Sequence, residues 1–244
     1  MRSVMFYIKI ADLKIRIRNK YNYVFALCKN YLTEECDDVD LDISVSEEQI
    51  SKEVAEAEIS VSEAYAECVC VYRNICNELP LRFESYLLHC ALIEYEGRGY
   101  AFAAKSGTGK STHISLWKKV FGDKVRIING DKPILRYING AFIAYGTPWC
   151  GKEGFEVNAS VPLSAICFIE RSKDNSISDL TTDEAVLRLF HQILQPKDTG
   201  TVDALFPLLD ATLRTVPCYL LKCNMEDEAA VVAYNGMKDK KDGK

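Results

Sequence analysis

The N-terminal residues alternate between apolar and polar positions in a way that predicts strands. Residues 6–10 are rich in aromatic and β-branched side chains, and residues 13–18 alternate strictly between the two classes. Such segments favour a pleated, half-buried surface, and Ala11-Asp12 between them is the expected tight turn. A helix is expected next, because Ser46 and Gln49 form a capping box just ahead of a stretch with apolar residues at helical spacing.

A second helix is expected over about residues 64–79, where one face carries apolar side chains at helical spacing. Pro80 is expected to end this helix, since proline lacks the amide hydrogen that a continuing helix needs. Residues 1–82 are therefore predicted to form a small N-terminal α+β region. Its boundary with the rest of the chain is soft, and the two parts could pack as one unit.

After Pro80, short apolar strands alternate with helical segments. Strands are expected at residues 87–95, 100–104, 125–129, 165–170 and 215–222, with a hairpin turn at Asn139-Gly140. Helices are expected at residues 110–121, from Thr181 and Glu184 to about Gln195 before Pro196, and from Asn224 through Met237. This order predicts an α/β core over residues 83–237, followed by a charged flexible tail at 238–244.

The composition of the chain argues against nucleic-acid and membrane partners. Of 244 residues, 48% are hydrophobic and 27% charged, and the net charge of −5 argues against a nucleic-acid partner. No run approaches the roughly 18 apolar residues that span a bilayer, and no signal-peptide core is visible, so we expect no membrane partner and a cytoplasmic location. The ten cysteines are scattered without zinc spacing, which predicts reduced thiols.

The most informative stretch is Ala104–Thr112, Ala-Lys-Ser-Gly-Thr-Gly-Lys-Ser-Thr, between a predicted strand and a predicted helix. Glycines let successive backbone amides point inward, and the following helix adds its positive end, so such a loop binds phosphates. Nucleotide-binding residues are expected to be Ser106, Gly107, Thr108, Gly109, Lys110, Ser111 and Thr112. Lys110 is expected to reach the β- and γ-phosphates, and Ser111 to ligate Mg²⁺. Ala104 replaces the usual first glycine.

Phosphoryl transfer also needs an acid on a neighbouring strand, to hold Mg²⁺ or to accept a proton. Asp131 follows the predicted strand 125–129 and lies 21 residues after Lys110, which suits one helix, one turn and a return strand. The alternative is that Asp131 only caps the turn Gly130–Pro133.

Several other side chains are weaker candidates for substrate binding. Trp149 and Lys152 lie in a glycine-rich segment that could border an acceptor pocket or form an ordinary turn. His113, in the first turn of the predicted helix, could face phosphates or solvent. Arg171 follows a buried strand and could approach the nucleotide, whereas His191 is expected to be structural.

The loop and its surroundings together resemble the HPr kinase/phosphorylase family, whose nucleotide core is shared with phosphoenolpyruvate carboxykinase. The likeness rests on the loop at 106–111, the strand 88–92 bearing His89, the two short strands between them, and the segment 128–131. It covers about residues 87–172. The fold it implies is an α/β phosphate-loop core with a mixed sheet. The implied activity is an ATP- and Mg²⁺-dependent serine kinase, with Asp131 as metal ligand or general base, His89 near the transferred phosphate, and Lys110 on the phosphates.

The resemblance leaves three points open. Gly130 replaces the first of two adjacent aspartates in that family, so a nucleotide-binding regulator or maturation partner with little turnover is the main alternative. The acceptor could be a protein, a peptide or a serine-like small molecule, and a homo-oligomer is an expectation by analogy only. Carboxykinase chemistry is the least favoured reading, because the chain is short and shows no arginine cluster.

Overall fold

The N-terminal region is a three-stranded sheet covered by helices. We describe a computed structural model over residues 4–194 and 199–238. The sheet order is β1-β2-β3, with β1 antiparallel to β2 and β3 parallel to it. Both turn residues of the first hairpin, Ala11 and Asp12, have positive φ, as a tight two-residue turn requires. The elements are β1 (Val4–Ile10), β2 (Leu13–Asn19), α1 (Asn22–Leu27), β3 (Leu41–Ser44), α2 (Glu47–Glu56) and α3 (Glu63–Arg82), with a 3₁₀ turn at Lys29–Tyr31.

Helix α3 continues through Pro80 to Arg82, although the sequence suggested that it would end near the proline. Leu79 is fully buried, and the amide of Phe83 donates to its carbonyl at 3.0 Å, which closes the last turn. Proline removes one helical hydrogen bond, but the buried residues before it, which end at Leu79, hold the helix in place. The capping box of α2 forms as expected between Ser46 and Gln49.

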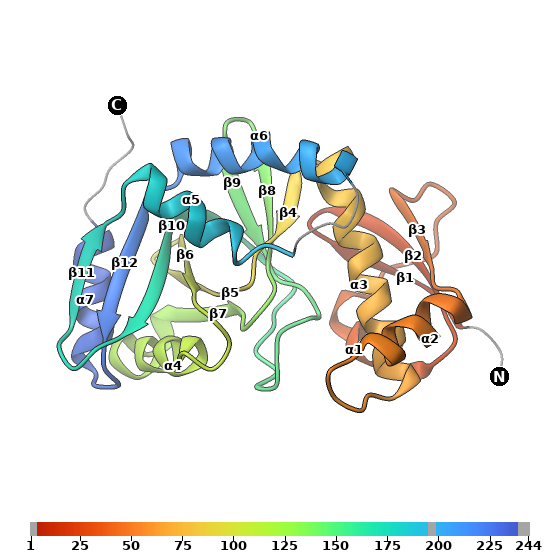
Figure 1. The fold of residues 1–244 in the computed structure, drawn as a ribbon, viewed down its shortest axis with the longest axis horizontal. Helices are drawn as coiled ribbons and strands as arrows, with labels where there is room; N and C mark the ends of the chain where they lie inside the picture. The colour runs from red at the N-terminus through yellow and green to blue at the C-terminus, as the bar shows by residue number, and fades with distance from the viewer. Residues whose placement is uncertain (1–3, 195–198, 239–244) are drawn as a thin grey trace.

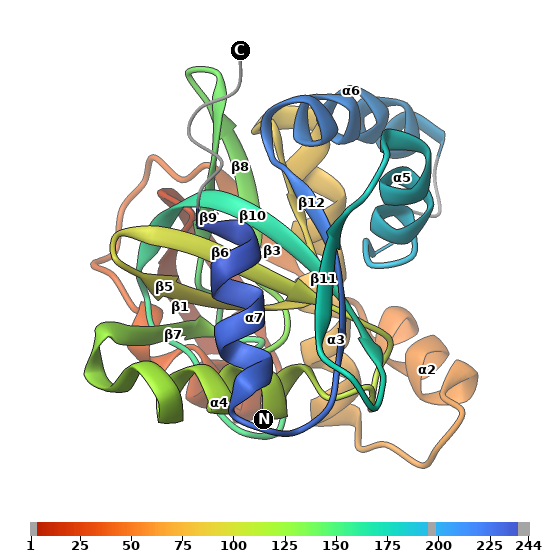
Figure 2. The same ribbon diagram turned by 90° about the vertical axis from the view of Figure 1, so that its left-hand side faces the viewer.

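The second part of the chain is a curled mixed sheet of nine strands (Figures 1 and 2). Its main path runs β4-β8-β9-β10-β6-β5-β7, and β12 pairs with both β10 and β11. The strands are β4 (Ser85–Leu87), β5 (Cys90–Tyr95), β6 (Arg98–Ala103), β7 (Val125–Asn129), β8 (Ile134–Ile138), β9 (Ala141–Tyr145), β10 (Ser160–Arg171), β11 (Ser176–Asp179) and β12 (Cys218–Cys223).

Helices cover both faces of this sheet. On one face α4 and α7 pack together over β5, β6 and β12, around the buried side chain of Trp117. On the other face α5 and α6 cover the sheet, and α6 lies across the end that holds β4, β8 and β9 (Figure 1). The helices are α4 (Lys110–Phe121), α5 (Thr182–Phe190), α6 (Thr199–Thr215) and α7 (Glu228–Met237), with a 3₁₀ turn at Gly122–Lys124.

The two sheets share a buried boundary. One hydrophobic cluster joins the N-terminal strands and α3 to Ile134, Tyr145 and Trp149 of the second part. Across the same boundary, Arg136 Nη1 donates to the carbonyl of Ala11 at 2.7 Å, and the Tyr145 hydroxyl donates to Asp12 at 2.7 Å. The N-terminal region is therefore fixed against the side of the large sheet.

Three further expectations from the sequence need correction, and one helix was not predicted. Helix α6 was not foreseen, because Pro207 interrupts its apolar pattern. Helix α5 ends at Phe190, and the predicted stop at Gln195 and Pro196 lies outside the described residues. Helix α7 begins at Glu228, because the Asn224 side chain accepts from the amide of Glu226 before the helix starts. The predicted strand 87–95 is broken between β4 and β5. Most of the predicted charged tail, residues 239–244, also lies outside the described residues.

Candidate functional site

Sheet topology brings four segments of the site to one edge. Strands β6, β7 and β10 run in the same direction, so their carboxyl ends meet there, and the antiparallel β5 begins at that edge. The glycine-rich loop follows β6, Asp131 follows β7, and Arg171 ends β10, while His89 immediately precedes β5. Carboxyl ends of strands are where open α/β sheets place their ligand sites.

The glycine-rich loop has the backbone that a phosphate cradle needs. Gly107 and Gly109 have φ of 76° and 126°, values that other residues rarely adopt. Helix α4 then begins at Lys110, so its free amides and positive end adjoin the loop. Arg171 donates to the carbonyls of Gly107 and Thr108, the latter at 3.0 Å, so those two carbonyls face the end of β10.

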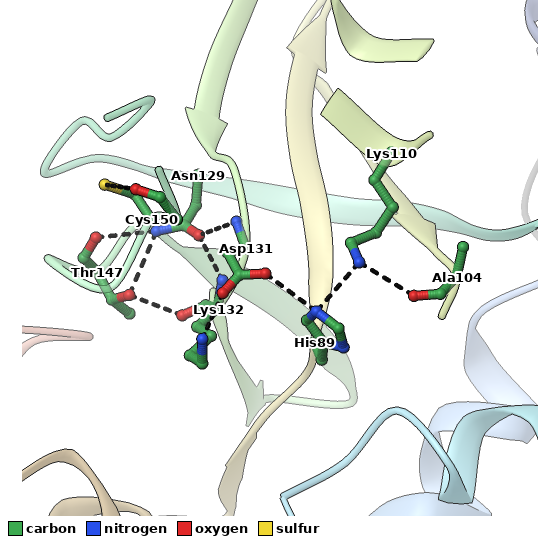
Figure 3. A network of polar contacts seen from close by, with 9 residues as sticks. His89, Ala104, Lys110, Asn129, Asp131, Lys132, Thr147 and Cys150 are labelled. Carbon is green, nitrogen blue, oxygen red and sulfur yellow. Dashed lines mark hydrogen bonds and ion pairs between the residues drawn. The ribbon is translucent and has the colours of Figure 1, made fainter. Parts of the chain in front are cut away.

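Lys110 lies in the floor of the site with 8% of its surface exposed. Its Nζ atom is 3.0 Å from His89 Nε2 and donates to the carbonyl of Ala104 at 3.0 Å (Figure 3). Burial lowers the pKa of Lys110, and the nearby charge of Asp131 opposes that effect. An ammonium that is already partly desolvated interacts strongly with an incoming anion.

Asp131 is held between two basic side chains. Its Oδ1 atom lies 3.0 Å from His89 Nε2, and its Oδ2 atom accepts from Lys132 Nζ (Figure 3). Burial alone would raise the pKa of Asp131, but the hydrogen bonds from His89 and Lys132 outweigh it and lower the pKa to about 2. The carboxylate is therefore ionised over the whole physiological range.

A buried asparagine fixes the position of Asp131. Asn129 is fully buried, and its Oδ1 atom accepts the amides of Asp131 and Lys132 at 2.9 and 2.7 Å. Its Nδ2 atom donates to the carbonyl of Thr147 at 2.9 Å, and the Thr147 hydroxyl donates back to the carbonyl of Lys132 at 2.7 Å. This side-chain turn is a general habit of asparagine, so a strand ending Asn-Gly-Asp could have indicated it.

The position of His89 depends on a partner far away in sequence. The His89 amide donates to the carbonyl of Gln192 at 2.7 Å. With its side-chain nitrogen turned toward them, Gln192 also donates to the carbonyls of His89 and Ala104, at 3.2 and 3.1 Å. The segment just after α5 thus connects the histidine strand to the start of the glycine-rich loop, and no sequence pattern predicted this contact.

Gly130 is packed too closely to carry a side chain. A Cβ atom added there would lie 2.6 Å from the carbonyl oxygen of Cys150 and 3.4 Å from Phe155 Cβ. Contacts below 3.0 Å with backbone do not occur without a shift of the chain. The segment 150–155 therefore occupies the space that an aspartate at this position would need.

Two cavities flank the loop. The first, about 790 Å³, is lined by His89, Lys110, Ser111, Asp131 and Lys132, and on its other side by the N-terminal helices and residues 148–153. The second, about 720 Å³, is lined by residues 104–108, the end of β10, Arg188 and His191. Both volumes fall within the range of about 300–1,000 Å³ that is usual for small-molecule sites.

The other predicted side chains divide between these cavities and the core. Trp149 and Lys152 line the larger cavity, although Trp149 is also packed on Tyr72 with ring centroids 5.8 Å apart. His113 is 2% exposed and accepts from Trp117 Nε1 at 3.0 Å, so it lies in the core and not against a substrate. This corrects the expectation for His113. His191, expected to be structural, borders the smaller cavity.

The larger cavity contains oxygen ligands of the kind that bind hard metal ions. Among the described residues, no three His, Cys, Asp or Glu side chains gather as a metal centre. Asp131 and Ser111 line the same cavity. Of the ten free cysteines, Cys68 and Cys150 also line it, and burial raises the pKa of both thiols. One carboxylate and one hydroxyl suit Mg²⁺, which relies on substrate phosphates for its remaining ligands.

Fold and site together define a mixed α/β protein in which a glycine-rich loop faces a lysine, a histidine and a carboxylate. The family model of the SynChlorMet cassette protein ScmC matches residues 50–228, so the chain belongs to that family. No curated protein matches the chain. Among solved structures, the Hpr(Ser) kinase/phosphatase from Coxiella burnetii is similar at 9% identity and a TM-score of 0.37, over 62% of this chain and 89% of that one. In the described residues, no helix is long and apolar enough to cross a membrane.

Proposed function

We propose that this protein is an ATP- and Mg²⁺-dependent kinase that transfers the γ-phosphoryl group to a hydroxyl, that of a serine in a protein, a peptide or a small molecule. The observation that carries the proposal is the contact of Lys110, His89 and Asp131 beside the glycine-rich loop. Phosphoryl transfer needs a phosphate cradle, a cation and a carboxylate at one place, and little covalent chemistry beyond them.

The positions of the two cavities suggest how the nucleotide lies. The larger cavity contains Lys110, Ser111 and Asp131, so we place the γ-phosphate and the acceptor there. The smaller cavity is bounded by the loop and by Phe168, Arg171 and Arg188, so we place the nucleoside there. Ser106 and Gly107 line both cavities, which is what a triphosphate that crosses the loop requires.

The residues that would hold Mg²⁺ are Ser111 and Asp131. When bound, the metal would supply positive charge that stabilises the transferring group. Lys110 adds a second positive charge, and His89 donates to Asp131 or faces the phosphate from the same side. Lys132 keeps Asp131 ionised and oriented. These fixed charges are aimed before the reaction begins, which is the main source of catalysis in such sites.

The far wall of the larger cavity favours an acceptor with apolar groups. Tyr23 and Tyr65, on α1 and α3, are 44% and 48% exposed and form an edge-to-face pair with centroids 6.3 Å apart. Both line the cavity together with Tyr72 and Leu27. Exposed tyrosines beside a polar centre bind side chains of a polypeptide better than they bind free serine, since free serine has no apolar surface to cover them.

The direct test uses purified protein, [γ-³²P]ATP and Mg²⁺ with three acceptors: free L-serine, peptides with serine beside tyrosine or phenylalanine, and water. We expect label on a serine hydroxyl, and its loss in Lys110→Met. Lys119→Met, on the exposed side of α4, is the matched control, because its Nζ atom pairs with Asp227 and not with the loop. Tight MgATP binding without transfer to any acceptor would contradict the proposal.

A second candidate is a nucleotide-binding regulator with little turnover, which the blocked position at Gly130 favours. Both candidates predict binding of MgATP. They differ in whether bound ATP is consumed, so the transfer assay with wild-type protein separates them.

A further inference from the structure

The turn that follows Cys150 brings a second carboxylate to the larger cavity. Gly151, Lys152 and Glu153 line this cavity together with Lys110 and Asp131. A carbon added to Gly151 would lie 3.8 Å from Asp131 Cγ and 3.5 Å from Glu153 Oε2. The two carboxyl groups therefore lie around one point, separated by a glycine that has no side chain to fill it.

The two carboxylates differ in their partners. Both oxygens of Asp131 are engaged, one by His89 and the other by Lys132. Glu153 is exposed, and its side chain forms no hydrogen bond or ion pair with any residue of 4–194 or 199–238. Its charge nevertheless acts on Lys110, in the direction opposite to burial and together with Asp131. Glu153 thus belongs to the electrostatic surroundings of the loop lysine while its oxygens remain available.

The backbone explains why a second acid would come from this turn. The position beside Asp131 is closed, since a side chain at Gly130 would collide with the carbonyl of Cys150. Two residues of the turn, Gly151 and Gly154, have positive φ of 84° and 67°, which lets the chain reverse tightly after it covers Gly130. The same segment that excludes a side chain at Gly130 therefore carries Glu153 into the cavity.

We propose that Glu153 is the base that accepts the proton of the acceptor hydroxyl, and this rests on the proposed kinase function. In the step, the acceptor oxygen forms its bond to the γ-phosphorus while the bond from that phosphorus to the β–γ bridging oxygen breaks. The bond electrons leave with ADP, and the hydroxyl proton moves to a Glu153 carboxylate oxygen. A base must have a free lone pair within reach of the hydroxyl. Glu153 lines the acceptor cavity with no hydrogen-bond or ion-pair partner among the described residues. The contacts of Asp131 with His89 and Lys132 lower its pKa and make it the weaker base, which leaves Asp131 for orientation and Mg²⁺.

The test compares Glu153→Gln, Glu153→Ala and Glu48→Gln with the wild type, all as the full chain. Glu48 is an exposed glutamate on α2, away from the cavity lining, and so controls for loss of surface charge. The acceptors are those of the transfer assay. Hydrolysis of ATP by water is the readout if no serine acceptor is phosphorylated. We expect Glu153→Gln to lower kcat by roughly 100-fold or more, the usual effect of losing a general base. The Kd for MgATP, measured by calorimetry, should stay within about twofold, because the base acts on the acceptor.

Adding a small carboxylate such as formate to the assay distinguishes loss of the base from structural damage to the turn. Added formate should restore part of the kcat of Glu153→Ala, where it can occupy the vacated space, and leave Glu153→Gln unchanged. A kcat for Glu153→Gln within about threefold of the wild type would overturn the proposal, as would a parallel loss of MgATP affinity. Absence of rescue by formate would count against it as well. No transfer by the wild type, even to water, would instead overturn the kinase function, and the role of Glu153 with it.

Discussion

His89 Nε2 lies 3.0 Å from Asp131 Oδ1 and 3.0 Å from Lys110 Nζ. One imidazole nitrogen carries either a proton or a lone pair, so it donates to Asp131 or accepts from Lys110, and never both. The proton on this nitrogen therefore decides which neighbour His89 holds. When Nε2 carries it, His89 donates to Asp131, and Lys110 keeps its hydrogen bond to the carbonyl of Ala104. We regard this shared contact as the link between the glycine-rich loop and the carboxylate.

Restoring an aspartate at Gly130 should not create a second catalytic acid. Gly130→Asp and Gly130→Ala both add a Cβ atom 2.6 Å from the Cys150 carbonyl. We expect each to lower the free energy of unfolding by roughly 1–3 kcal/mol, the usual cost of overpacking. Urea unfolding of the two variants and the wild type measures this. A stable Gly130→Asp variant with raised kinase activity would show that the segment 150–155 can move aside.

Lys132 should govern the ionisation of Asp131. Its ammonium pairs with Asp131 Oδ2 and lies 5.8 Å from the centre of the Tyr72 ring. Lys132→Met should raise the pKa of Asp131 from about 2 toward or above its ordinary value of 3.8. NMR titration of the carboxyl carbon measures the change directly, and an unchanged pKa would show that His89 alone is sufficient.

The lowered pKa of Asp131 also sets how the free energy of unfolding should depend on pH. A carboxyl whose pKa is depressed on folding contributes stability above pH 3.8, and this is lost as the pH falls toward about 2. The contribution is roughly 2 kcal/mol in the wild type. The difference in unfolding free energy between the wild type and Lys132→Met should therefore be larger at pH 6 than at pH 3.

Buried His113 should make the protein sensitive to mild acid. Burial lowers the pKa of His113 from 6.5 to about 4, so the unfolded chain binds a proton that the folded chain does not. Protons then favour unfolding, and stability should fall by roughly 3 kcal/mol as the pH drops from about 6.5 to about 4. His113→Gln still offers an acceptor to Trp117 but cannot titrate, so its unfolding free energy should vary less over this interval. Equal slopes for both proteins would contradict the assignment.

The aromatic wall should affect the acceptor and not the nucleotide. Tyr65→Ala removes one ring of the exposed pair with Tyr23. We expect the KM for a tyrosine-containing serine peptide to rise by roughly 3- to 10-fold, the worth of one aromatic contact, with the Kd for MgATP unchanged. Phe206→Ala is the matched control, because Phe206 is 54% exposed on α6 and lines neither cavity. Equal changes for free serine and the peptide would argue against a subsite for neighbouring side chains.

The sequence by itself determined the local features of this protein. The hairpin at Ala11-Asp12, the capping box at Ser46 and the strand–loop–helix around Lys110 all follow from interactions within a few residues. The number of residues between the loop and Asp131 could also be predicted from the sequence, because one helix and one return strand have a predictable length. These features depend on backbone preferences that a short window contains.

Only the tertiary structure decided which groups meet. His89 reaches Asp131 because the antiparallel β5 lies between β6 and β7, and no local pattern specifies that strand order. Helix α3 passes Pro80 and His113 turns into the core because packing outweighs local propensity. Gly130 looked like a missing acid, but its neighbours Cys150 and Phe155 make it a required glycine. Contacts between distant segments carry free energies that compete with, and here exceed, the preferences of single residues.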